Sequence, residues 1–266
     1  MPTPPDFRDA RDARRPVLED GQAVAVGGRE FRVVVSARRR RIGLTVERDG
    51  SLVLRVPENC EAERAETFLR KGDAWLADKL GRREEHPPAH PVRGIREGET
   101  FGYLGRTYRL RSGDGGKGQA PVRLVAGRLV VDETLLQDPV AARRALIGWY
   151  RSSGRNWAQG RLQPWAARME VQEPGVVVRD VGNRWGTYRP GEDGHGTMAL
   201  HWALFQLPSH LVDYVIAHEL AHIRISGHGA DYWALLRQAM PECEERKGEL
   251  DDLGRRLWLG HVRERD

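Results

Sequence analysis

The sequence predicts an α+β protein in which a β-rich N-terminal region precedes a mainly helical core. Two segments, 21–57 and 98–132, contain short runs with the apolar–polar alternation of half-buried strands. Helix signals prevail from residue 136 onwards. A chain of 266 residues is long enough for one or two domains. We therefore expect a tail over 1–20, a β-rich region with one helix over 21–135, and the core over 136–260, with no apparent internal repeat.

The composition argues against a membrane protein, a secreted protein and a disulfide-rich protein. No stretch approaches the roughly 18–20 apolar residues of a membrane span, and the first twenty residues lack the apolar segment of a secretion signal. The cysteines, Cys60 and Cys243, are too few and too far apart for a disulfide framework or a cysteine-rich zinc site. We expect a cytoplasmic protein with no membrane partner; its oligomeric state is left open.

The N-terminal strands are expected at 31–35, 42–47 and 51–56. Asp49-Gly50 separates the last two runs, and Asp-Gly between two apolar runs is typical of a tight hairpin. Asn59 then has the character of a helix N-cap, and apolar spacing predicts an amphipathic helix ending near Gly81.

Arginine supplies 39 of the 43 basic side chains, yet the formal net charge is only +5. The arginines are dispersed among acids, except for the run Arg38–Arg41 between two expected strands. Arginine suits phosphate recognition, but dispersed charge is more typical of a solvated surface. The sequence therefore predicts only weak, salt-sensitive binding to nucleic acid.

The second half alternates helices and strands. Asp138-Pro139 pairs an N-cap with proline at the first helical position, and we expect Gly160 or Pro164 to kink or divide the helix before Met169. Strands are expected at 176–180, 185–188 and 197–202, and a further helix at about 209–225.

This last helix contains the motif HExxH, formed by His218, Glu219 and His222. Two histidines four residues apart differ by about 40° around a helix, so both imidazoles can reach one metal ion. Glu219 is displaced by about 100° from His218, where it can act on a water at the metal without ligating.

The residues around the motif are apolar on almost every side, which predicts a buried helix. Buried polar groups need partners, and a metal with its water would satisfy both histidines and Glu219. The alternative is a pair of core histidines held by ordinary hydrogen bonds, with a carboxylate that reaches solvent.

An open catalytic zinc site needs a third protein ligand. Gly227 can end the helix, and His228 follows on the returning chain, six positions after His222. The competitor is a carboxylate from the next segment, where the candidates are Glu242, Glu244, Glu245 and Glu249. That segment is strongly charged and has no clear buried glutamate position, which favours His228.

These residues resemble the YgjP-like (SprT-like) zinc metallopeptidases. The motif and the following HGADYW (228–233) are similar to the family's HELAH and HSxxFW, and NRWGTY (183–188) is similar to its RWGSC strand. The resemblance spans roughly residues 25–260. It implies a zincin-like helix–sheet–helix metallopeptidase core, with Zn²⁺ held by His218, His222 and His228, and Glu219 as the catalytic base.

The chain departs from the family pattern at three positions. Thr187 and Tyr188 replace the usual Ser-Cys, and His201 stands where the family often has Asn. The metal ligands and the base match, so the departures bear on substrate fit more than on metal binding. Trp185 and Gly186 are most simply interpreted as packing and close-approach residues beside the site.

The resulting hypothesis is a zinc-dependent peptidase that acts on a protein or peptide substrate. Two other classes of protein stay open. One is an SprT-like protease that acts on nucleic-acid-bound proteins, and the other is a non-catalytic, zinc-stabilised binding module.

Overall fold

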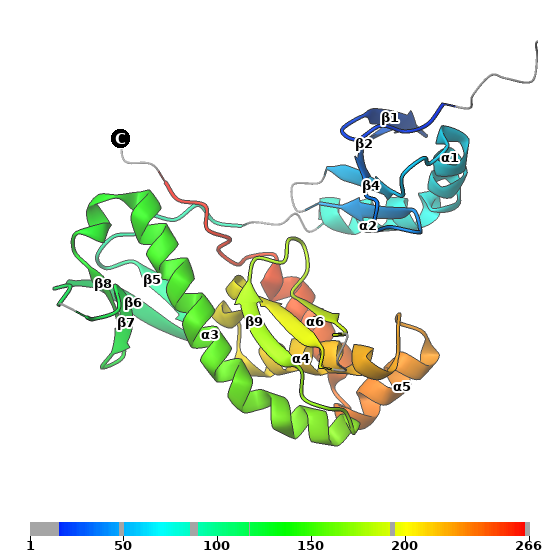
Figure 1. Ribbon diagram of the computed structural model, residues 1–266. Helices are drawn as coiled ribbons and strands as arrows, with labels where there is room; N and C mark the ends of the chain where they lie inside the picture. The colour runs from blue at the N-terminus through cyan, green and yellow to red at the C-terminus, as the bar shows by residue number, and fades with distance from the viewer. Residues whose placement is uncertain (1–15, 48–50, 86–89, 117, 192–194, 264–266) are drawn as a thin grey trace, which may run out of the picture. The chain divides into compact units, whose positions relative to one another are not determined.

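The computed structural model describes residues 16–47, 51–85, 90–116, 118–191 and 195–263, in which helices and sheets are mixed (Figure 1). The chain divides into two compact units, residues 1–87 and 88–266, called here the N-terminal and C-terminal units. The predicted β-rich region covered residues 21–135. The observed division instead places residues 88–135 in the C-terminal unit.

The N-terminal unit contains one four-stranded sheet, ordered β1-β2-β4-β3. Neighbouring strands are antiparallel except β2 and β4, which are parallel. The expected turn at Asp49-Gly50 lies outside the described residues, although β3 and β4 do pair in antiparallel register. Its elements are β1 (Ala23–Val26), β2 (Arg29–Val35), β3 (Gly43–Val46), β4 (Leu52–Val56), α1 (Ala62–Lys71) and α2 (Asp73–Glu85).

The core of this unit lies between one face of the sheet and the two helices. Phe31 and Val33 of β2 and Leu54 of β4 are buried, and they belong to the same apolar cluster as Leu69 of α1 and Leu76 of α2. The alternation of β2 therefore puts its apolar residues on the helix side of the sheet.

The helical segment differs from its prediction. Asn59 is not the N-cap: it adopts a left-handed φ of 56°, and α1 begins at Ala62 after Glu61. Gly72 separates α1 from α2, so two helices replace the expected single one, and α2 continues past Gly81 to Glu85. Glycine weakens helix continuation because it has the greatest backbone freedom.

The C-terminal unit contains two sheets and four α-helices among the described residues. Its strands are β5 (Thr100–Tyr103), β6 (Arg106–Gly113), β7 (Val122–Val125), β8 (Arg128–Asp132), β9 (Gly175–Arg179), β10 (Gly186–Arg189) and β11 (Thr197–His201). Its helices are α3 (Pro139–Met169), α4 (Ser209–Arg224), α5 (Ala230–Ala239) and α6 (Cys243–Gly254), with 3₁₀ turns η1 (Leu135–Gln137) and η2 (Trp202–Gln206).

The sheet β5–β8 repeats the topology of β1–β4. Its order is β5-β6-β8-β7, again with the second and fourth strands parallel. Both first hairpins turn through two residues of positive φ, Gly27-Gly28 and Leu104-Gly105, each followed by arginine. The chain thus contains a structural repeat that is not apparent from its sequence, because different apolar residues satisfy the same pattern.

The β5–β8 sheet belongs with α3 because they share one core. Leu110 of β6 and Leu129 of β8 lie in the same apolar cluster as Leu146 and Trp149 of α3. The N-terminal strands belong to a separate cluster, which accounts for the division near residue 87.

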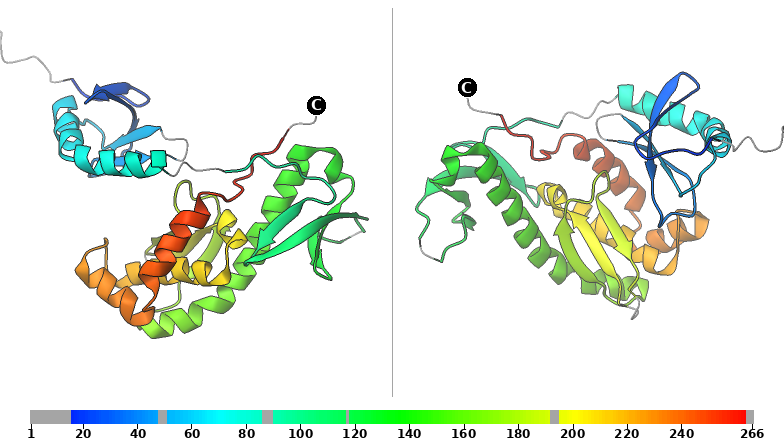
Figure 2. Two further views of the ribbon diagram at one scale, coloured as in Figure 1. Left: turned by 180° about the vertical axis from the view of Figure 1, so that it is seen from behind. Right: turned by 45° about the horizontal axis from the view of Figure 1, so that its top comes forward.

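Helix α3 extends from the β5–β8 sheet to the β9–β11 sheet (Figures 1 and 2). Asp138 caps it, as expected, by accepting hydrogen bonds from the backbone N–H groups of Val140 and Ala141. Neither Gly160 nor Pro164 ends the helix, because the surrounding Leu162 and Trp165 are buried. No helix among the described residues has both the length and the apolarity needed to cross a membrane.

Gly154 of α3 packs closely against Phe205 of η2. A Cβ at this position would lie 2.5 Å from the Phe205 ring. We predict that Gly154→Ala lowers the free energy of unfolding by about 1–3 kcal/mol, because the buried ring must shift. Urea denaturation measures this change.

Gly160→Ala is the matched control, since a Cβ there meets nothing within 4 Å. It should stabilise the protein by about 0.5–1 kcal/mol through helix propensity alone. Equal effects of the two substitutions would contradict the close packing of Gly154 on Phe205.

Candidate metal centre

Helix α4 is buried along most of its length. Ten of its 16 residues are buried, among them the charged side chains of Asp213 and Glu219. It packs between α3, α5, α6 and strand β10. The all-round apolar pattern therefore predicted its burial correctly, and every polar group on this helix needs a partner within the fold.

The three predicted histidines converge at the end of α4. His218 and His222 are partly buried on α4, and His228 is exposed on the segment between α4 and α5. One ligand nitrogen from each ring lies within 4.8 Å of the others. Gly227, at a φ of 84°, allows the chain to return towards the helix.

The spacing of the nitrogens fits a tetrahedral metal site. The Nε2 atoms of His218 and His228 lie 3.2 Å apart. Two nitrogens bound at 2.0–2.1 Å to one tetrahedral zinc would be separated by about 3.3 Å. Burial, together with the neighbouring His222 and His228, lowers the pKa of His218 to about 3. His218 is therefore neutral, as a metal ligand must be.

Two contacts orient the imidazole of His222, and a third joins Tyr232 to the backbone of His218. The Nδ1–H of His222 donates to the carbonyl of Ile225 at 3.1 Å, which leaves its Nε2 free to bind a metal. The buried Tyr232 of α5 stacks on His222, with ring centroids 4.9 Å apart. Its hydroxyl donates to the carbonyl of His218 at 3.3 Å. Tyr232 thus ties α5 to both ligands of α4.

Glu219 lies beside the triad in the same cavity, whose volume is about 510 Å³. Its side chain is 5% exposed. Burial raises the pKa of Glu219 to about 7, against the opposing effects of the Arg184 charge and a hydrogen bond from the Tyr188 backbone. The buried carboxylate is thus poised to accept and release a proton near neutral pH.

Strand β10 reaches Glu219 through a glycine. A Cβ on Gly186 would lie 2.7 Å from both Cγ and Oε1 of Glu219 and 2.9 Å from Cγ1 of Val215. Only a residue without a side chain can occupy this position while Glu219 and Val215 stay in place. The close-approach interpretation of Gly186 thus has a definite structural reason.

Trp185 is one of the residues that line the cavity. A Cβ on Gly254 of α6 would meet its indole at 2.8 Å, and its ring lies edge-on to His201, 5.7 Å away. His201 is buried, and its Nδ1 accepts from the backbone N–H of Ala203. Thr187 and Tyr188 also line the cavity, where they can contact a substrate.

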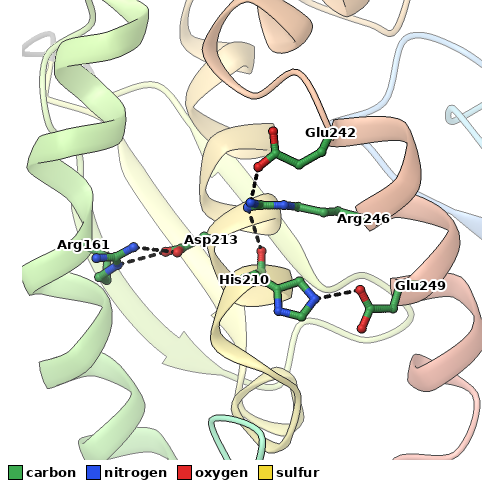
Figure 3. Close-up of polar contacts among 6 residues, drawn as sticks. All are labelled: Arg161, His210, Asp213, Glu242, Arg246 and Glu249. Atoms are coloured by element: carbon green, nitrogen blue, oxygen red, sulfur yellow. Dashed lines mark hydrogen bonds and ion pairs between the residues drawn. The ribbon is translucent and has the colours of Figure 1, made fainter.

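The competing carboxylates are engaged elsewhere. Glu249 accepts from His210 at 2.6 Å, Glu242 pairs with Arg246, and Glu244 pairs with Arg237 (Figure 3 shows the first two). The Glu249 contact joins α6 to α4 and the Glu244 pair joins α6 to α5, whereas the Glu242 pair is local to the start of α6. Glu245 is exposed, and the metal-binding cluster of the described residues contains no glutamate.

An ion pair that the sequence analysis missed anchors α4 to α3. Arg161 donates to both oxygens of the buried Asp213, at 3.0 and 2.6 Å (Figure 3). The two residues are 52 positions apart, so no local pattern links them. The single acid within the apolar stretch before HExxH was the available signal, because a buried carboxylate needs a cationic partner.

Comparisons with known proteins identify a family match. A family model described as YgjP-like, metallopeptidase domain matches residues 40–253. Among solved structures, the metallopeptidase zymogen abylysin of Pyrococcus abyssi is 22% identical, with a TM-score of 0.33 over 38% of this chain and 98% of its own. A comparison with curated proteins gives no match.

Because Gly186 contacts Glu219 closely, we predict that substitutions at the two positions have non-additive effects on the free energy of unfolding. Gly186→Ala should lower the free energy of unfolding by about 1–3 kcal/mol through overpacking. In a Glu219→Ala background the loss should be smaller, because two of the three conflicting atoms are gone. A double-mutant cycle by urea denaturation measures the difference. An identical loss in both backgrounds would show that the two residues do not compete for space.

Proposed function

Because the family model matches most of the chain, the protein belongs to the YgjP-like metallopeptidase family, and we propose that it is a zinc-dependent peptidase. In this proposal His218, His222 and His228 hold Zn²⁺, and Glu219 is the general base. The proposal includes a zincin-like core in which α3, the β9–β11 sheet and α4 position the site.

The observation that supports this function most strongly is the placement of four groups in one cavity. Three imidazoles converge within 4.8 Å, and the buried Glu219 lines the same space without belonging to the cluster. Three histidines fill the protein's share of a tetrahedral catalytic zinc site and leave one position for substrate or water. A purely structural site would have a fourth protein ligand.

Zinc supplies, when bound, a Lewis acid that polarises the scissile carbonyl and lowers the pKa of water to about 7. Glu219 takes the proton of the attacking water and later passes it to the leaving amine. Gly186 and the backbone N–H of Tyr188 hold the carboxylate in place. Tyr232 and the carbonyl of Ile225 keep the imidazole of His222 oriented.

The sheet next to the cavity suits an extended peptide. Its order, β10-β11-β9, leaves β10 at the edge among the described residues, and residues 186–188 of β10 line the cavity. An edge strand offers backbone groups that can pair with a peptide added as a further strand. The proposed substrate is therefore a protein or peptide segment in extended conformation.

A cytoplasmic location belongs to the same proposal. Cys60 and Cys243 are both buried free thiols, as is usual for proteins of a reducing compartment.

The substitution Glu219→Gln distinguishes an enzyme from a zinc-stabilised binding module. Gln is nearly isosteric and cannot accept the proton. We predict that the variant keeps its zinc and its fold, while cleavage of casein or a peptide library falls by about 10²–10⁴-fold. Metal analysis and the peptidase assay are performed on the same preparation.

Glu173→Gln, at an exposed position outside the cavity, is the control and should cleave at the wild-type rate. Wild-type cleavage by Glu219→Gln would contradict the mechanism. Loss of zinc from that variant would make Glu219 a structural partner of the site and favour the binding module.

A further inference from the structure

The β5–β8 sheet has one face in the core and one open face. The residues of the open face follow from the strand register: Arg109 of β6 is paired with Arg128 of β8, and Arg111 is paired with Val130, which is paired with Arg123 of β7. Paired residues point to the same side of a sheet. Four arginines therefore share this face, and the sheet lies at the opposite end of the C-terminal unit from α5 (Figures 1 and 2).

Two of these arginines, Arg109 and Arg128, have no acidic partner within the described part of the chain. Arg109 and Arg128 are both exposed and form no ion pair there. Arg123 donates to the carbonyls of Ala120 and Asp114, and its charge also interacts with the carboxylate of Asp132 on the same face. Arg111 forms an ion pair with Glu97 at 3.1 Å.

The direct pairing of Arg109 with Arg128 is the most informative feature. Neighbouring strands lie about 4.8 Å apart, and like charges opposite each other destabilise a sheet. The acid of this face, Asp132 of β8, accepts from the backbone N–H and the hydroxyl of Thr134, and its charge interacts with Arg123 and not with Arg109 or Arg128. A bound anion would relieve this repulsion, and the planar guanidinium matches a phosphate in particular.

The other residues of the open face bear on whether a bound nucleic acid would be single-stranded or a duplex. Proteins that bind single strands stack the bases on aromatic side chains. The remaining residues on this side of the sheet are small, aliphatic or acidic, and none is aromatic: Thr100, Gly102, Thr107, Gly113, Val125, Val130 and Asp132. The face can therefore contact phosphates but offers no aromatic side chain on which bases could stack.

We propose that the open face of the β5–β8 sheet binds the phosphate backbone of a nucleic-acid duplex, without sequence preference. Arg109, Arg123 and Arg128 make the contacts. The inference does not depend on the peptidase function, because the site and this face involve different residues. It assigns the weak duplex binding expected from the sequence to a surface other than Arg38–Arg41.

Fluorescence anisotropy with a labelled 20-base-pair DNA duplex, between 20 and 200 mM salt, tests the proposal. Three phosphate contacts predict a slope of about −2.7 in log K against log salt, and a dissociation constant in the range of about 10⁻⁴–10⁻⁶ M near physiological salt. The double variant Arg109→Ala/Arg128→Ala should reduce the slope by about 2 and weaken binding at every sequence tested.

Arg144→Ala/Arg155→Ala is the matched control, since it removes the same charge from exposed positions of α3. Its slope should equal that of the wild type, and urea denaturation should show both double variants folded. Equal losses in the two double variants would overturn the proposal, because binding would then follow net charge alone. Tighter binding of a single strand, or of polyglutamate through Arg109 and Arg128, would also overturn it.

Discussion

The structure depends on a buried helix that contains polar side chains. Helix α4 fills the space between α3, α5, α6 and β10, yet it includes a carboxylate at Asp213, a carboxylate at Glu219 and an imidazole at His218. Each of these groups would be costly to bury alone. Arg161 neutralises Asp213, the β10 backbone reaches Glu219, and the remaining imidazoles surround His218. Polar groups of α4 are thus in direct contact with α3 and β10.

The repeated four-stranded sheet is a part of the fold that forms without the buried polar groups of α4. The sheets β1–β4 and β5–β8 have the same order and the same first turn, but they belong to different cores. The β5–β8 sheet packs on α3, which in turn holds α4 through Arg161. The corresponding N-terminal sheet packs on its own short helices and is a separate compact unit. One supersecondary structure is therefore used in two different packing environments.

The sequence predicted most local elements and the convergence of the three histidines, and the resemblance to the YgjP-like family is confirmed by the family model. Local patterns sufficed because strand alternation and the four-residue spacing of HExxH are properties of short segments. The parallel pairing of β2 with β4, the Arg161–Asp213 pair and the contact of Gly186 with Glu219 join distant segments. The break at Gly72 was missed because the apolar spacing continues across it. Such features depend on tertiary packing, which periodicity does not encode.

Zinc analysis of purified His228→Ala beside the wild type tests the central claim, that three imidazoles from α4 and the following segment hold one metal ion. We expect about one zinc per wild-type chain and loss of most of it in His228→Ala. His261→Ala, an exposed histidine outside the cluster, should keep the wild-type content. Full retention of zinc by His228→Ala would contradict the ligand set and assign the third position to another side chain.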